Sequence, residues 1–365
     1  WGSDEGLKTG MRTPVVSVVM AVYNGMPWLP QTLASLRSQT FDDFEVVLID
    51  DGSTDDTAKI LRATAEADAR FRVITQTNQG LVASLNRGIA EARGTLIARL
   101  DSDDLAMPDR LAMQVDFMRR HPDVAVVGSA IRIIDAEGVA HRRQAYPCAP
   151  EDVRSALPYG CALAHPAVMM RRDVVQAVGG YRESFRHAED YDLWLRLAEK
   201  HELANLPQEL LRYRQHGSSV SFRHRQQQAL ATYVARYFAR ERRAGRAEPT
   251  IAHDKPLPAD ILSQLGLSPS ARAEFVQESL RAALSPPGQT LDDTWLGQQM
   301  EEAWSLRTHL RAGRFVRRCA IPYYRRCRRI GQADQASVWL GRAWRLSALH
   351  ALWSLVAAAA RSTKD

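Results

Sequence analysis

The fold is indicated first by the run VVSVVMAV at residues 15–22, which is almost entirely apolar and rich in β-branched side chains. A run of this length without polar alternation predicts a strand that is buried on both faces. The segment FEVVLIDDGS (44–53) has the same apolar character, and further strands are predicted at 71–75 and 95–100. Helical patterns occupy the intervals between them. Strand and helix alternating at this spacing predict a doubly wound α/β sheet.

Polar side chains follow three of the predicted strands. The first strand leads into AVYN (21–24), the second into DDGS (50–53) and the fourth into DSDD (101–104). Because ligands bind beyond the carboxyl ends of the strands in open α/β sheets, we expect these three segments to border one site.

The DSDD segment places three carboxylates, Asp101, Asp103 and Asp104, within four residues. Such a cluster is unfavourable unless a cation neutralises it, and oxygen ligands select hard ions such as Mg²⁺ or Mn²⁺. The alternative is that Asp103 or Asp104 only caps the turn before residues 107–110. A D-x-D pattern alone leaves both interpretations open.

Three further polar positions each allow a structural and a functional interpretation. Asp51 either caps a helix or accepts hydrogen bonds from a nucleobase. Glu189 and Asp190 open a predicted helix (187–200). Either they are there because the helix dipole stabilises acids in the first turn, or one of them acts as a general base on a hydroxyl group. His216 ends a predicted strand and is either exposed or completes a metal shell as a neutral imidazole.

The charge of the chain is unevenly distributed. The formal net charge is +6, but residues 301–365 hold 13 basic residues against four acidic ones, so residues 1–300 are slightly negative. Within this region, 314–331 and 336–361 interleave arginine with aromatic residues. This predicts either helices that lie on an anionic membrane surface or a small helical domain that packs on itself or on a second subunit. Nucleic-acid binding is not expected because no recognisable module is present.

The length of 365 residues predicts more than one domain. We expect a leader unrelated to the fold at 1–10, an α/β domain at 11–245, a proline-containing linker at 246–260 and a basic helical region at 261–365. The four cysteines are widely spaced and lack a C-x-x-C pair, which indicates neither a zinc cluster nor a disulfide framework. Together with the lack of a signal-peptide pattern, this predicts a cytoplasmic protein, which is either free in the cytoplasm or peripheral on the inner face of the cell membrane.

Six ordered stretches make the sequence resemble the family 2 glycosyltransferases, the large inverting group with the GT-A fold. These stretches span residues 15–221, and they are VSVVMAVYNG, SLRSQTFDDFEVVLIDDGSTDDT, NQGLVASLNRGIAEARGTLIARLDSDDLAMPDRL, HPAVMMRR, GGYRESFRHAEDYDLWLRLAE and LLRYRQHGSSVS. The resemblance implies a Rossmann-like, doubly wound mixed sheet, with the C-terminal helical region as an addition to the family's core.

The resemblance also implies roles for individual residues. The nucleotide would be bound by Ala21, Tyr23, Asp51, Asp101 and Ser102. Asp103 would bind the metal, with His216 close to it. Asp190 would be the catalytic base, with Glu189 supporting it or contacting the acceptor.

The reaction implied by the resemblance is the transfer of a hexose from a nucleotide-sugar, with UDP-sugar as the expected donor, to a saccharide or lipid-linked acceptor. Mn²⁺ or Mg²⁺ would stabilise the departing diphosphate, and a single displacement would invert the anomeric centre. Two alternatives stay open, a nucleotidyltransferase that makes the nucleotide-sugar and a noncatalytic binding protein. The first should carry a basic, glycine-rich loop after the first strand, where this chain has YNGMP (23–27).

Overall fold

The computed structural model describes residues 13–216, 225–258, 260–284, 293–306 and 334–340, and the single residues 323, 327 and 342. The chain divides into two compact units. The first contains residues up to 222 together with 235–256, and the second contains 223–234 together with the residues from 257 onward.

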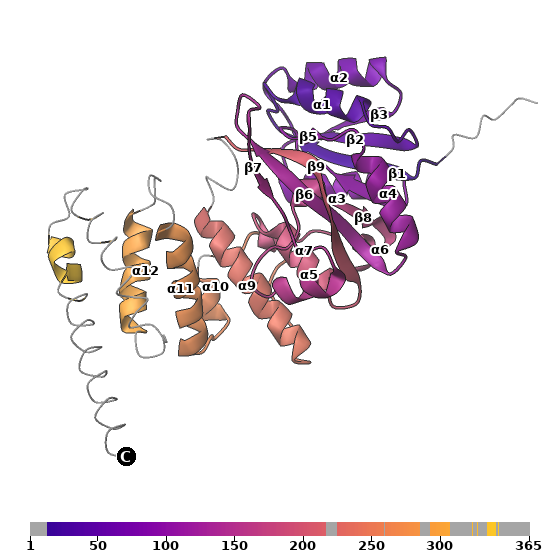
Figure 1. Cartoon of the computed structure of the whole chain (residues 1–365). Helices are drawn as coiled ribbons and strands as arrows, with labels where there is room; N and C mark the ends of the chain where they lie inside the picture. The colour runs from indigo at the N-terminus through magenta and orange to yellow at the C-terminus, as the bar shows by residue number, and fades with distance from the viewer. Residues whose placement is uncertain are drawn as a thin grey trace, which may run out of the picture. The chain divides into compact units, whose positions relative to one another are not determined.

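A mixed sheet forms the centre of the first unit (Figure 1). Its described strands lie in the order β3 (Phe71–Thr75), β2 (Phe44–Asp50), β1 (Val16–Val22), β4 (Leu96–Arg99), β8 (Met169–Arg171), β6 (Val124–Ile134), β9 (Glu202–Arg214) and β5 (Leu105–Ala106), with β7 (Ala140–Gln144) paired to β6. Strands β1 to β4 are mutually parallel, whereas β8 is antiparallel to both of its neighbours. The mixed, doubly wound sheet predicted from the sequence is confirmed.

Helices cover both faces of this sheet. The described helices of the first unit are α1 (Leu29–Arg37), α2 (Thr57–Ala67), α3 (Leu81–Glu91), α4 (Arg110–Arg120), α5 (Pro150–Ala156), α6 (Arg172–Ala177) and α7 (Glu189–Leu197), with 3-10 turns η1 (His165–Ala167) and η2 (Glu183–Phe185). Leucines of α1, α2 and α4 join Val18 and Met20 of β1 in one core cluster, so these helices lie on one face. On the other face α3 approaches β1 so closely that a Cβ at Gly88 would lie 2.4 Å from Val19 Cγ1. Glycine is therefore required at that crossing.

The second unit is helical where it is described. It includes the first part of α9 (Arg225–Arg243), α10 (Ile261–Gln264), α11 (Pro269–Leu284) and α12 (Asp293–Ser305). Trp339 is buried, with Tyr323 and Trp304 packed edge-on against its ring and the Arg342 guanidinium above it. These contacts fit the prediction that tryptophans here pack within a small helical domain. Most of 314–361, for which membrane contact was the alternative, lies outside the described residues.

Among the described residues, no helix combines the length and apolar character needed to span a bilayer. The predicted domain boundaries stay predictions. Glu248 and His253, which fall in the predicted linker, contact Arg182 and Ser184 of the first unit.

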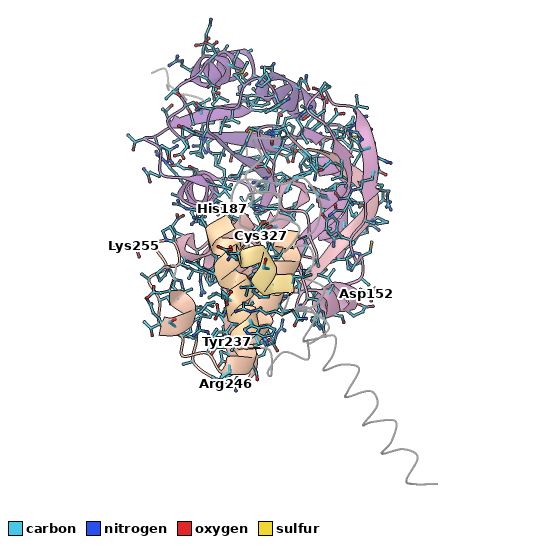
Figure 2. The ribbon with its side chains drawn as sticks, turned by 90° about the vertical axis from the view of Figure 1, so that its left-hand side faces the viewer. Asp152, His187, Tyr237, Arg246, Lys255 and Cys327 are labelled. Atoms are coloured by element: carbon cyan, nitrogen blue, oxygen red, sulfur yellow. The ribbon has the colours of Figure 1, made fainter. Side chains whose placement is uncertain are left out.

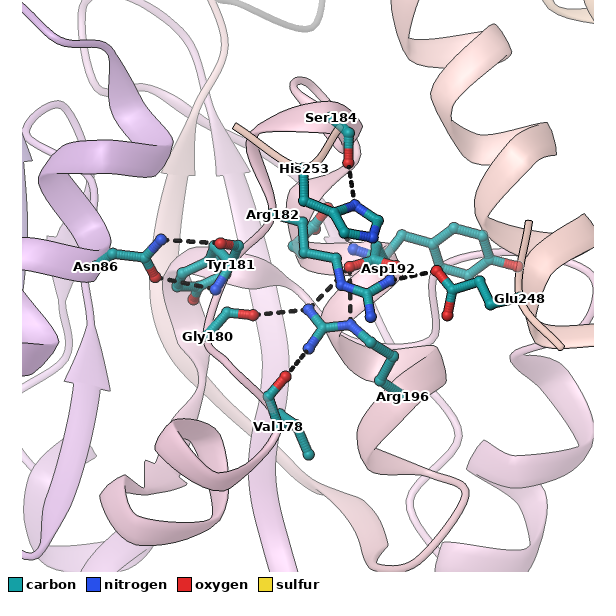
Figure 3. A network of polar contacts seen from close by, with 12 residues as sticks. Asn86, Val178, Gly180, Tyr181, Arg182, Ser184, Asp192, Arg196, Glu248 and His253 are labelled. Atoms are coloured by element: carbon teal, nitrogen blue, oxygen red, sulfur yellow. Dashed lines mark hydrogen bonds and ion pairs between the residues drawn. The ribbon is translucent and has the colours of Figure 1, made fainter. Parts of the chain in front are cut away.

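A buried polar network stabilises the segment that leads into α7 (Figure 3). Arg196 pairs with Asp192 on the same helix and donates hydrogen bonds to the carbonyl oxygens of Val178 and Gly180, at 2.6 and 2.7 Å. Asn86 of α3 bonds both backbone polar groups of Tyr181. The network thus connects the glycine turn at 179–180 to two helices of the sheet domain.

We expect Arg196→Met to lower the free energy of unfolding by about 3 kcal/mol, because breaking a buried ion pair leaves Asp192 with less compensation for its lost hydration. Urea denaturation measures this change. Lys200→Met, an exposed position just after α7, is the control and should change stability by less than about 0.5 kcal/mol. Equal stability of the two variants would show that the network contributes nothing measurable.

Candidate active site

The candidate site lies at the carboxyl edge of β1, β2 and β4, where two loops hold each other in place. The backbone N–H of Asn24 donates to Ser53 Oγ at 3.0 Å, and Thr54 N–H donates to Asn24 Oδ1 at 2.8 Å. Gly25 N–H bonds Thr57 Oγ1 at 2.8 Å. The loops after β1 and β2 are therefore fixed as one surface, as expected for parallel strands that end at the same edge.

Two predicted nucleotide contacts lie on this surface. Ala21 sits within β1 opposite Ile49 of β2 and is half-buried. The Tyr23 side chain, just beyond the strand, is 53% exposed. Since its ring is accessible at the sheet edge, it can stack against a planar ligand, while the role of either residue stays a prediction.

Asp51 is buried and already has three hydrogen bonds. Its carboxylate accepts from Gln76 Nε2 at 2.7 Å and from the backbone N–H groups of Gln79 and Gly80 at 2.8 and 2.9 Å. Asp51 therefore fixes the loop before α3. Whether the same carboxylate also reads a nucleobase stays a prediction, and the structural and functional interpretations are compatible because a carboxylate can accept about four hydrogen bonds.

The three carboxylates of the DSDD segment converge. Asp101, Asp103 and Asp104 each offer an oxygen atom, and these atoms lie within 4.8 Å of one another. Asp104 is fully buried, and its Oδ2 has no hydrogen-bond partner among the described residues. Burial first, and then the neighbouring carboxylate charges, raise the pKa of both Asp103 and Asp104. Ionised together, these groups repel one another, so the donor set fits a hard divalent cation.

The backbone of Ser102 is tied to helix α1. Thr32 Oγ1 donates to the Ser102 carbonyl oxygen at 2.9 Å, which holds the middle of the DSDD turn. The predicted nucleotide contact of Ser102 stays a prediction.

His216 lies next to the carboxylate cluster. Its Nε2 is 2.8 Å from Asp103 Oδ2, and its ring packs against Trp28 with 4.1 Å between the ring centroids. The pairing orients the imidazole toward the site, but a role as a metal ligand stays a prediction.

Arg214 is a supporting residue that the sequence analysis missed. It is 1% exposed at the end of β9, its backbone N–H donates to Asp104 Oδ1, and its Nε donates to the Asp103 carbonyl oxygen, both at 2.8 Å. Its Nη1 bonds the carbonyl oxygens of Asp135 and Ala136. Arg214 thus holds the DSDD turn. The only sign of this role in the sequence is that Arg214 is a basic residue near the end of the predicted strand, two positions before His216.

The two acids predicted to act as the catalytic base and its support, Glu189 and Asp190, lie at the start of α7. His187 (Figure 2) has φ 72°, a left-handed conformation in which the chain turns into the helix. The first-turn helical position is confirmed, with Glu189 as the first residue. Asp190 accepts a hydrogen bond from the Tyr191 N–H at 2.7 Å, and the Cys161 thiol lies 3.8 Å from its other oxygen.

Both acids of this pair have raised pKa values. Burial, followed by the charge of Asp190, raises the pKa of Glu189 to about 7. Burial also raises the pKa of Asp190, while the Tyr191 N–H and the positive charge of Arg99 oppose the rise. A carboxyl group with a pKa close to neutrality, as Glu189 has, can exchange a proton with a substrate at physiological pH, which suits general acid–base chemistry.

Arg99 is the second residue that the sequence analysis missed. It is 3% exposed at the end of β4, and its guanidinium forms an ion pair with Asp101. Its charge also acts on Glu189 and Asp190. Arg99 thus pairs directly with the DSDD cluster, while Glu189 and Asp190 come from a segment of the chain 85 residues or more further on.

A mixed, doubly wound sheet with a carboxylate cluster at the carboxyl edge of its parallel half defines the GT-A class of glycosyltransferases. Two solved structures share this fold. Staphylococcus aureus TarS 1-349 in complex with UDP has 15% identity and a TM-score of 0.53, covering 91% of this chain and 88% of that one. The mannosyltransferase PcManGT from Pyrobaculum calidifontis, in complex with GDP-Man and Mn²⁺, has 19% identity and a TM-score of 0.50, covering 86% and 88%.

The sequence comparisons then identify the family. Residues 17–179 match the family model described as Glycosyl transferase family 2. The O-antigen biosynthesis glycosyltransferase WbnJ of Escherichia coli is 34% identical over 232 residues, 62% of this chain and 88% of that protein. The amylovoran biosynthesis glycosyltransferase AmsE of Erwinia amylovora is 33% identical over 212 residues, 57% and 79% of the two chains. The chain belongs to the family 2 glycosyltransferases, which confirms the resemblance found in the sequence.

Proposed function

We propose that the chain is a metal-dependent, inverting glycosyltransferase that moves a sugar from a nucleotide-sugar, with a UDP-sugar as donor, to an acceptor hydroxyl group in polysaccharide or glycoconjugate biosynthesis. The observation that carries the proposal is the convergence of three carboxylates suited to a divalent ion at the carboxyl edge of the sheet, together with two largely buried acids at the start of α7 whose pKa values are raised. The names of WbnJ and AmsE support the polysaccharide context, and the UDP complex of TarS supports the donor.

In this proposal the donor lies along the carboxyl edge of the sheet. Tyr23 stacks on the nucleoside, Asp51 accepts from the base, and Asp101 and Ser102 lie near the ribose or diphosphate. Asp103, with His216 beside it, would hold Mn²⁺ or Mg²⁺, and the bound ion would neutralise charge on the leaving diphosphate. These assignments follow the resemblance, and the convergence of the carboxylates supports them.

Asp190 is the proposed base for the acceptor. Its carboxylate takes the proton of the acceptor hydroxyl group as that oxygen forms a bond to the anomeric carbon. The bond between the anomeric carbon and the diphosphate oxygen breaks, and its electron pair leaves with the nucleoside diphosphate. A single displacement inverts the anomeric centre, and Glu189, buried beside Asp190, supports the base.

Two alternative activities give different products. A nucleotidyltransferase would release pyrophosphate, whereas the proposed enzyme releases a nucleoside diphosphate, and a binding protein releases neither. The loop after β1 also disfavours a nucleotidyltransferase, because residues 23–27 contain no lysine or arginine.

The basic C-terminal region is proposed to bring the enzyme to a lipid-linked acceptor at the inner face of the membrane or to mediate self-association. Its excess of basic over acidic residues supports contact with anionic lipid. The packing of Trp339 with Tyr323 supports the alternative of a folded helical module.

Donor choice can be tested by thermal unfolding with a panel of nucleotides. We expect UDP or a UDP-sugar with Mn²⁺ to raise the melting temperature by several degrees, because a ligand at about 100 times its Kd stabilises the native state by about 2.7 kcal/mol. Mn²⁺ alone and UDP with excess EDTA are the controls and should have a smaller effect. A larger rise with GDP or ADP than with UDP would contradict the proposed donor.

A further inference from the structure

Tyr159 is 85% exposed, more than any other large hydrophobic residue that the structure describes. It lies just beyond α5, and its backbone N–H donates to the Ala156 carbonyl oxygen at 2.9 Å. At the next residue, Gly160, a Cβ would have no atom of the described residues within 4 Å apart from its chain neighbours. A single exposed tyrosine is ordinary on a protein surface. What distinguishes Tyr159 is the way its loop is attached to the candidate site.

The loop formed by residues 157–162 is hydrogen-bonded at both of its ends. At its start, the Tyr191 hydroxyl group donates to the Leu157 carbonyl oxygen. At its end, Asn205 of β9, which is 3% exposed, donates from Nδ2 to the Ala162 carbonyl oxygen at 3.0 Å. Tyr191 directly follows Asp190, so one of the two attachments is to the first turn of α7. A surface that is held in place before a ligand arrives loses less conformational entropy when the ligand binds.

Cys161 brings the same loop into contact with the proposed base. Its Sγ lies 3.8 Å from Asp190 Oδ2 and 3.2 Å from the Leu163 carbonyl oxygen, and the residue is exposed. Two residues of chain span at most about 7 Å, so Tyr159 starts within that distance of Cys161. A ligand that places a hydroxyl group at Asp190 therefore lies beside Cys161 and within reach of the Tyr159 ring.

The composition of the loop indicates the chemistry of such a ligand. Its sequence, LPYGCA (157–162), contains no charged residue. It therefore offers no cation to a phosphate group or to an anionic lipid headgroup. The tyrosine ring offers a flat, rigid face with negative charge density, which suits the C–H groups on the apolar face of a sugar ring. These properties favour a neutral saccharide over an anionic ligand.

We propose that residues 157–162 form the acceptor platform: the Tyr159 ring stacks on the apolar face of a pyranoside acceptor and so directs the acceptor's hydroxyl group toward Asp190. This inference rests on the proposed function, since it takes Asp190 as the base. It names the acceptor class as a saccharide, and it assigns Tyr159 as a residue that determines acceptor specificity.

The test is the steady-state kinetics of the full-length chain with saturating nucleotide-sugar and methyl hexopyranosides as acceptors, namely the glucoside, the galactoside and the N-acetylglucosaminide. Tyr159→Ala should raise the acceptor KM about tenfold, as expected for the loss of one aromatic stacking contact and its buried area. Its kcat at saturating acceptor should stay within about twofold of wild type, because Asp190 is untouched. Tyr159→Phe and Tyr159→Trp keep a stacking face and should keep the wild-type acceptor KM.

Val139→Ala is the control for loss of exposed apolar surface. Val139 is 58% exposed in the turn between β6 and β7, and its substitution should leave the acceptor KM unchanged. All of these variants should keep the wild-type melting temperature, because the replaced side chains are exposed.

Two results would overturn the inference. One is an unchanged acceptor KM in Tyr159→Ala, or an equal rise in Tyr159→Phe, since the ring face would then contribute nothing. The other is a wild-type chain that hydrolyses its nucleotide-sugar but transfers to none of the glycosides, because the acceptor would then not be a simple pyranoside. A wild-type chain that releases no nucleoside diphosphate from any nucleotide-sugar refutes the proposed function instead.

Discussion

Replacing Asp190 with asparagine should reduce kcat for sugar transfer by about 100- to 10,000-fold, the usual contribution of a general base. The amide keeps the shape of the side chain and can still accept from the Tyr191 N–H, so the start of α7 should be preserved. Donor affinity should change little, because the proposed donor contacts lie on the loops after β1, β2 and β4. Steady-state kinetics together with calorimetric titration of UDP and Mn²⁺ measure both quantities.

Asp192→Asn is the matched control on the same helix. Asp192 is 1% exposed and pairs with Arg196, so its substitution should lower stability while kcat at a temperature well below unfolding stays within a few-fold of wild type. If Asp190→Asn transfers sugar at the normal rate and Glu189→Gln does not, then Glu189 is the base. The raised pKa of Glu189, about 7, makes that comparison necessary.

Replacing Asp103 with alanine should abolish most metal-dependent transfer. We expect kcat/KM to fall by about 100- to 1,000-fold, the size of effect seen when one group that stabilises transition-state charge is removed. The affinity for Mn²⁺ in the presence of UDP should fall in parallel, which calorimetry measures independently of turnover. Excess EDTA should suppress wild-type transfer to a comparable level.

Stability should respond differently from activity in this variant. Because folding raises the pKa of Asp103 above its ordinary value, the ionised carboxylate opposes folding at neutral pH. Asp103→Ala should therefore be no less stable than wild type without metal, and Mn²⁺ should stabilise it less. Asp109→Asn, an exposed acid beyond the cluster, is the control and should behave as wild type in both assays. Normal transfer by Asp103→Ala, or transfer unaffected by EDTA, would refute the metal role.

Local sequence patterns predicted most of the sheet. The run at 15–22 forms β1 at Val16–Val22, and the apolar segment before Asp51 forms β2 at Phe44–Asp50, because an uninterrupted apolar run has few other ways to be buried. The patterns did not predict β7 (Ala140–Gln144), whose residues AHRRQ are mostly exposed. These residues form a strand because they pair with β6, and the hydrophobic periodicity of a segment does not show which strand it pairs with.

The candidate residues could be named from the sequence because their chemistry is local. Three acids directly after a buried strand, and two acids at the start of a helix, are visible without a structure. The contacts that constrain them are not local. Asp51 bonds the backbone at Gln79 and Gly80, Asp103 meets His216, and the pairing of β9 with β5 brings Arg214 onto the DSDD turn.

Hydrophobic periodicity and short motifs depend only on neighbouring residues, so they were sufficient to predict the α/β class, the family and the acidic positions at the strand ends. Only the tertiary structure showed that the buried Arg99 forms an ion pair with Asp101, and that Arg214 supports the DSDD turn from the far end of the chain's last described strand. The physical reason is that a buried charge is stable only where the fold surrounds it with opposite charges. Those partners are joined by packing across the sheet and not by spacing along the chain.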